Sequence, residues 1–97
     1  MSQFIRSGKP VHINGTTTAG TADHWPCRGT TNQLVVNNVH ASEPIEVFLT
    51  LEAMAAGAGN GFTIRAGYGH SFPVEVIEFW TLSTNASTFQ AVAIHRT

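Results

Sequence analysis

Residues 72–82 read FPVEVIEFWTL and contain the strongest strand pattern in the chain. Even-numbered positions from Val74 to Trp80 fall on one face of an extended segment, and odd-numbered positions from Glu75 to Thr81 fall on the other. Both faces carry bulky side chains, which is typical of a strand that is covered on both sides. Pro73 stands near the start, where a missing N–H is tolerated. We therefore expect residues 72–82 to form one central strand of a β-sheet.

Further runs rich in Val, Ile, Leu and Phe flank this stretch and are separated by turn residues. They span residues 33–39, 45–51, 62–66 and 88–95, and a short strand is also expected at residues 10–14. Residues 52–58 have a helix-forming composition, but Gly57, Gly59 and Gly61 predict a glycine-rich loop there instead. The pattern predicts an all-β fold, a small antiparallel β-sandwich or barrel of five to seven strands.

The first third of the chain differs from the rest in amino-acid composition. It is rich in Gly, Thr, Ser and Pro, with little periodicity between Thr16 and Thr21. We expect residues 1–30 to form an extended N-terminal arm and loops, and residues 31–97 to form the β-sandwich domain. The apolar residues of this arm are candidate partner contacts, and they are Phe4, Ile5, Val11 and Ile13.

Composition narrows the class of function. Charged residues make up only 11% of the chain, the formal net charge is -1, and the five Lys and Arg residues are scattered singly. A phosphate backbone needs a basic stripe, so no nucleic acid partner is expected. No run of 18 apolar residues and no signal-peptide core is present, so we expect no membrane span and a cytoplasmic site of synthesis. A weakly charged surface loses its water cheaply, which favours docking or homo-oligomerisation.

No motif predicts an enzyme, a metal site or a cofactor. Ser71 begins like a nucleophile elbow, but Pro73 takes the place of the required small residue and a strand pattern follows. His24 and Cys27 have ligand-like spacing, yet no second pair exists to complete a four-ligand zinc site. Trp25, Tyr68 and Trp80 could form a sugar-stacking platform, although Trp80 is expected in the core.

Five segments follow one another in a distinctive order: LVVNNV (34–39), IEV (45–47), IRAG (64–67), FPVEV (72–76) and QAVAI (90–94). This order resembles small β-sandwich structural proteins of tailed-phage virions, namely capsid decoration (cement) and head-spike base proteins. The resemblance implies a protein that binds the major capsid protein, often as a trimer, and stabilises the head at the capsid surface of the virion. The alternative is a small carbohydrate- or ligand-binding β-sandwich module of a larger assembly.

Overall fold

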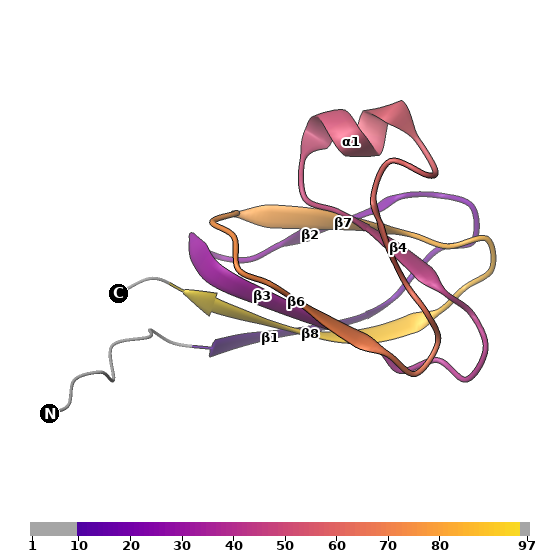
Figure 1. Cartoon of the computed structure of the whole chain (residues 1–97), viewed down its shortest axis with the longest axis horizontal. Coiled ribbons are helices and arrows are strands. Elements are labelled where there is room, and N and C mark those ends of the chain that lie inside the picture. Colours follow the sequence, from indigo (N-terminus) through magenta and orange to yellow (C-terminus); the bar gives the residue numbers. More distant parts are fainter. Residues whose placement is uncertain (1–9, 96–97) are drawn as a thin grey trace, which may run out of the picture.

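The computed structural model describes residues 10–95, which fold into two facing four-stranded sheets (Figure 1). The first sheet has the order β1-β8-β3-β6 and the second the order β2-β7-β4-β5, with every neighbouring pair antiparallel. The strands are β1 (Pro10–Thr16), β2 (Asp23–Pro26), β3 (Thr31–Asn38), β4 (Ile45–Phe48), β5 (Phe62–Ile64), β6 (Gly69–Phe72), β7 (Glu78–Leu82) and β8 (Thr88–His95). The predicted all-β antiparallel sandwich is confirmed, with eight strands in residues 10–95 where five to seven were expected.

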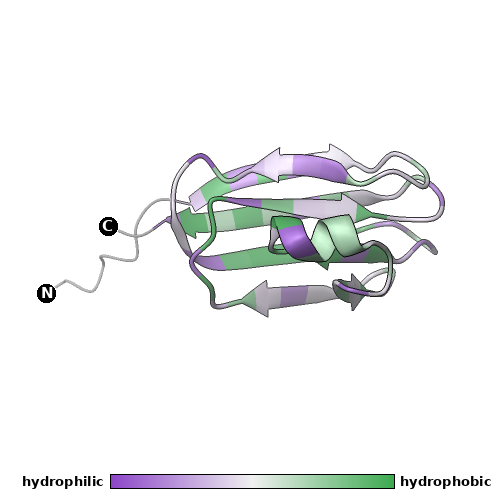
Figure 2. Ribbon diagram, turned by 90° about the horizontal axis from the view of Figure 1, so that it is seen from above, coloured by the Kyte–Doolittle hydropathy of each residue, from purple (hydrophilic) through white to green (hydrophobic). Residues whose placement is uncertain are grey.

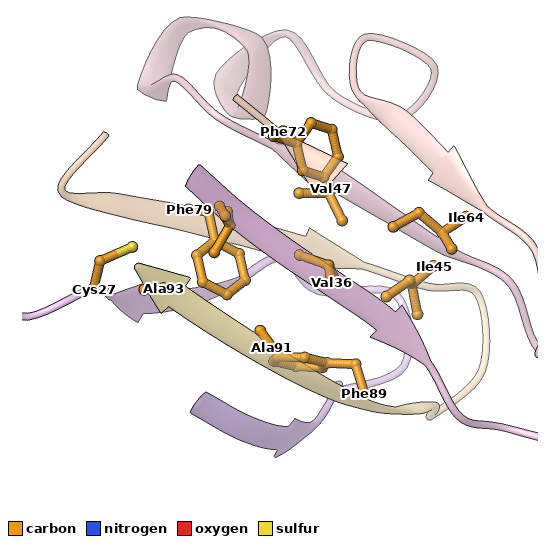
Figure 3. Close-up of a cluster of buried hydrophobic side chains, with 11 residues drawn as sticks. Cys27, Val36, Ile45, Val47, Ile64, Phe72, Phe79, Phe89, Ala91 and Ala93 are labelled. Atoms are coloured by element: carbon orange, nitrogen blue, oxygen red, sulfur yellow. The ribbon is translucent and has the colours of Figure 1, made fainter. Parts of the chain in front are cut away.

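Alternation along the strands builds the core between the sheets. Phe89, Ala91 and Ala93 of β8 point inward and are fully buried, as the two-residue period of residues 88–95 predicts. They meet Phe79 and other side chains of the second sheet (Figure 3). The two alanines leave room for the larger rings opposite, so the sheets can approach closely.

Two strands lie within the segment predicted as an arm. β1 pairs with β8 along its whole length, from Pro10 opposite Ile94 to Thr16 opposite Thr88. β2 pairs with β7 at the edge of the second sheet. Residues 10–26 are therefore part of the sandwich, and an arm can begin only before residue 10, outside the described residues. The short strand expected at residues 10–14 is confirmed and is two residues longer.

Residues 72–82 are not one strand, because the chain changes sheets in the middle of this run. β6 ends at Phe72 at the edge of the first sheet, and β7 begins at Glu78 inside the second. Between them the Thr31 hydroxyl donates to the Val74 carbonyl at 2.8 Å and accepts from the Val76 amide at 3.1 Å. These bonds replace those of a strand ladder. The expected central position is confirmed only for residues 78–82.

The helix α1 (Leu51–Ala56) replaces the predicted loop over part of its length. The Thr50 hydroxyl caps it by accepting from the Ala53 amide, and Gly57 ends it with a φ of 95°. α1 lies over the outer face of the second sheet (Figures 1 and 2). There Phe48 and Trp80 are paired across β4 and β7, and they are only 1% and 7% exposed. Within residues 10–95 no helix is long and apolar enough to cross a membrane.

Candidate functional site

The residues considered for catalysis or metal binding do not assemble into a site. Ser71 lies within β6 and accepts a hydrogen bond from the Gln33 side-chain amide at 2.6 Å, so it has the partner of a surface serine. Within residues 10–95 no group of three or more His, Cys, Asp or Glu side chains is placed to hold a metal ion.

His24 and Cys27 lie on opposite sides of the second sheet. His24 faces outward, where its Nε2 lies 2.7 Å from a carboxylate oxygen of Glu78 and its ring lies against Trp80. Cys27 is fully buried among the core side chains. Burial, reinforced by the charge of Glu78, raises the pKa of the Cys27 thiol to about 11. At neutral pH the sulfur is protonated, which suits neither a nucleophile nor a metal ligand.

The predicted partner contacts fall into two groups. Phe4 and Ile5 lie outside the described residues. Val11 and Ile13 lie on the inner face of β1, half-buried and packed against the core cluster. Their contact with a partner stays a prediction, and their packing against the core of their own sandwich leaves only part of each side chain accessible to a partner.

Within residues 10–95, the outer face of the first sheet contains no Asp, Glu, Lys or Arg, and we call it the neutral face. Its side chains alternate with the buried ones of the same strands and meet across the sheet in rows, such as Asn14, Gln90 and Asn37. Val35 and Val92 form a half-buried apolar pair at its centre. The neutral face consists of Pro10, His12, Asn14, Thr16, Gln33, Val35, Asn37, Gly69, Ser71, Thr88, Gln90, Val92 and Ile94.

The second sheet differs from the first because it is partly covered and carries charge. α1 lies on its outer face, and Glu46 of β4 accepts hydrogen bonds from the Gly59 and Gly61 amides. A groove of about 360 Å³ runs beside this loop, with Glu43 and Glu46 among its lining residues. Glu43 accepts from the amide and the side chain of Asn85. Both carboxylates therefore serve as anchors for local loops.

A smaller hollow, which we call the edge cleft, opens where the edge strands β5 and β6 leave the sandwich uncovered. Its volume is about 220 Å³, and its lining residues are Phe62, Thr63, Ile64, Arg65, Tyr68, Gly69 and His70. The Phe62 ring lies over the His70 imidazole with centroids 4.1 Å apart. Phe72 supports both rings from the buried side, at 5.4 Å from Phe62 and 4.6 Å from His70.

The rim of the edge cleft is held by backbone hydrogen bonds. The Tyr68 amide donates to the Arg65 carbonyl at 3.0 Å, and the Asn38 amide donates to the Tyr68 carbonyl at 2.8 Å. Gly67 adopts a φ of 80°, which permits this tight turn. The side chain of Tyr68 is 62% exposed and that of Phe62 is 43% exposed. The rings of Tyr68 and Phe62 are therefore accessible to solvent, and the turn beside them is held in one conformation by backbone hydrogen bonds.

The predicted platform of Trp25, Tyr68 and Trp80 does not form. Trp25 packs edge-on against Phe89 in the core and donates from its indole N–H to the Thr81 hydroxyl. Trp80 is buried on the outer face of the same sheet, whereas Trp25 lies on its inner face, and of the three rings only that of Tyr68 is exposed. Sequence reasoning missed Phe62 and Arg65 as neighbours of Tyr68, although the glycines around Tyr68 indicated an exposed turn.

Comparisons with known proteins support the fold of the chain and do not indicate a function. No protein-family model and no curated protein matches the chain. Solved structures do match. Streptomyces albus HEPD, solved with 2-hydroxyethylphosphonate and Fe(II), has a TM-score of 0.59 at 15% identity over 91% of this chain. Protein NMB1881 from Neisseria meningitidis has a TM-score of 0.52 at 17% identity, over 89% of this chain and 83% of its own.

The chain spans only 18% of the HEPD structure that it matches. At this identity the likeness extends to the β-sandwich architecture alone, because unrelated functions share such folds.

Proposed function

We propose that this chain is a structural docking protein that binds the outer surface of a protein shell, as a capsid decoration (cement) protein of a tailed phage does. The observation that supports the proposal best is the neutral face. The major capsid protein is the proposed partner, the capsid surface of the virion is the proposed location, and no chemistry is assigned to the chain.

The chemistry of the neutral face suits contact with another protein. Burying an unpaired charge at an interface costs several kcal/mol, and in the described part of the chain this face has no Asp, Glu, Lys or Arg to bury. The amides of Asn14, Gln90 and Asn37 form a row that can exchange hydrogen bonds with a partner's backbone. Val35 and Val92 provide an apolar centre within the polar surroundings. This arrangement resembles the apolar core and polar rim of protein interfaces.

The size of the neutral face argues for several copies acting together. Three strands of seven or eight residues and the four-residue β6 together cover on the order of 400 Å². A stable interface uses about 800 Å² per partner, so one copy docks weakly. Linking copies raises the effective concentration of each remaining contact and can increase avidity by about a hundredfold or more. We therefore include homo-oligomerisation, as a trimer, in the proposal.

Co-sedimentation with capsids assembled from the major capsid protein of the same genome tests the proposal. The full chain should pellet with capsids, and Gln90→Glu with Asn37→Asp should lower the bound fraction at least tenfold. These substitutions change shape little and add two charges to the neutral face. Ala86→Glu, in the exposed turn before β8, adds a charge away from that face and should bind normally.

Melting curves of all variants should coincide, since the substituted side chains are exposed. Failure of the unmodified chain to pellet with capsids would refute the decoration role. Equal losses in the control and in the double variant would refute the neutral face as the docking surface. A monomer at all concentrations by sedimentation velocity would refute the oligomer.

A further inference from the structure

We propose that the edge cleft is a binding site for one acidic sugar ring, with Tyr68 and Phe62 contacting the ring and Arg65 binding its carboxylate. This inference goes beyond docking, since the cleft lies at the β5–β6 side of the sandwich and the neutral face lies on the flat side of the first sheet.

Two aromatic rings of the edge cleft, those of Tyr68 and Phe62, are exposed. Tyr68 is 62% exposed, so a ligand that covers its ring removes apolar surface from water, which favours binding. Phe62 lies in the same cleft and is held by His70 and Phe72, so its position is set before any ligand arrives. Sugar rings have apolar C–H faces that stack on aromatic side chains, whereas their hydroxyls need polar partners at the edges. The cleft provides such partners from His70 and Arg65.

The edge cleft carries a positive charge. Its lining includes Arg65 and no carboxylate. Within residues 10–95, the guanidinium of Arg65 makes no hydrogen bond or ion pair, and the one ion pair found there joins His24 to Glu78. A guanidinium binds a carboxylate through two parallel hydrogen bonds. An acidic sugar therefore complements the cleft better than a neutral one.

The edge cleft is small, and its rim is ordered. A volume of about 220 Å³ lies below the roughly 300–1,000 Å³ of pockets for drug-sized ligands, so the cleft takes a single ring. Arg65 and Tyr68 occupy one turn that is closed by the Tyr68 amide and tied to Asn38. Because the turn is already ordered, binding loses little conformational entropy.

Titration of the ¹⁵N-labelled full chain with D-glucuronate and with D-glucose tests this proposal, since the two sugars differ by one carboxylate. We expect saturable shifts of the amides from Arg65 to His70, with D-glucuronate binding about tenfold more tightly. Acetate at the same concentrations should produce no saturable shift there. Equal binding of the two sugars, or equal binding of acetate, would refute the acidic-sugar assignment.

Variants identify the residues responsible. Arg65→Gln should lower the D-glucuronate affinity about tenfold and leave the D-glucose affinity unchanged. Tyr68→Ala should weaken both sugars about fivefold. The matched controls are Arg28→Gln, an arginine outside the cleft, and Ile77→Ala, a side chain that is 59% exposed at another site.

Neither control should alter binding, and Tyr68→Ala should melt with the unmodified chain because its side chain lies mostly in solvent. Absence of saturable binding by either sugar would overturn the site. Binding that survives both cleft substitutions would also overturn it, as would an acidic peptide that binds these residues when neither sugar does.

Discussion

Gly15 of β1 lies against the indole ring of Trp25 on β2, so closely that a Cβ at residue 15 would stand 2.7 Å from the ring carbon Cζ3. The two residues lie on different sheets, at the edge opposite β5 and β6. The absence of a side chain at Gly15 is therefore what allows Trp25 to close this edge of the sandwich. Trp25 is held in turn by its hydrogen bond to Thr81 and its contact with Phe89.

Gly15→Ala should therefore destabilise the fold. The added methyl group must displace a ring that is fixed by the core, and such overpacking costs about 1–3 kcal/mol. Denaturant unfolding measures this as a lower midpoint with an unchanged slope. In the Trp25→Leu background the same substitution should cost much less, because the clashing ring is gone. Equal costs in the two backgrounds would show that the contact with Trp25 is not the cause.

Thr31 makes the second testable connection, because it joins the start of β3 to the segment that changes sheets. Thr31→Val keeps the shape of the buried side chain and removes the bonds to the Val74 carbonyl and the Val76 amide. Leaving these two backbone groups without partners should cost about 2–4 kcal/mol in unfolding free energy. Thr30→Val, at the exposed neighbouring position, is the control and should cost less than about 0.5 kcal/mol.

The sequence predicted the sandwich well where one face of a strand is buried and the other is not. Residues 88–95 form β8 with Phe89, Ala91 and Ala93 inward, as their alternation indicated. The prediction of one strand over residues 72–82 was wrong, because Val74 and Val76 pack against the core even though they do not lie in a strand. Local periodicity cannot distinguish a central strand from a crossing segment whose hydrogen bonds come from a distant threonine.

The site was harder to predict than the fold, because it depends on which edges and faces remain uncovered. The sequence indicates the strand at residues 10–14 but not its pairing with β8, so it does not place Val11 and Ile13 against the core. The neutral face combines alternate residues from four strands that are distant in sequence, so only the strand order reveals it. Phe62 and His70 meet because β5 and β6 lie at matching edges of different sheets.

The capping of α1 gives a prediction about the outer face of the second sheet. Thr50→Ala removes the hydroxyl that accepts from the Ala53 amide, which should cost about 1 kcal/mol. A six-residue helix has little stability of its own, so the loss should loosen the packing of α1 on β4, where Phe48 is paired with Trp80. Acrylamide should then quench tryptophan fluorescence more strongly than in the unmodified chain. Thr50→Ser keeps the cap and should behave normally; equal quenching in both variants would contradict the capping role.

The buried thiol of Cys27 should lower the free energy of unfolding at alkaline pH. Burial, followed by the charge of Glu78, raises the pKa of its thiol from 9.0 to about 11. The unfolded chain thus loses this proton at lower pH than the folded chain, and ionisation favours unfolding once the pH exceeds about 9. The contribution of Cys27 is fully present below that pH and is lost as the pH rises through about 11.

Denaturant unfolding at a series of pH values should show a steeper decline in this window for the unmodified chain than for Cys27→Ala. Because other groups titrate there in both proteins, the difference between the two curves isolates the thiol. Parallel curves would contradict the raised pKa, as would rapid reaction of the native thiol with a disulfide reagent at pH near 8, since the folded chain should hold the sulfur protonated and out of reach.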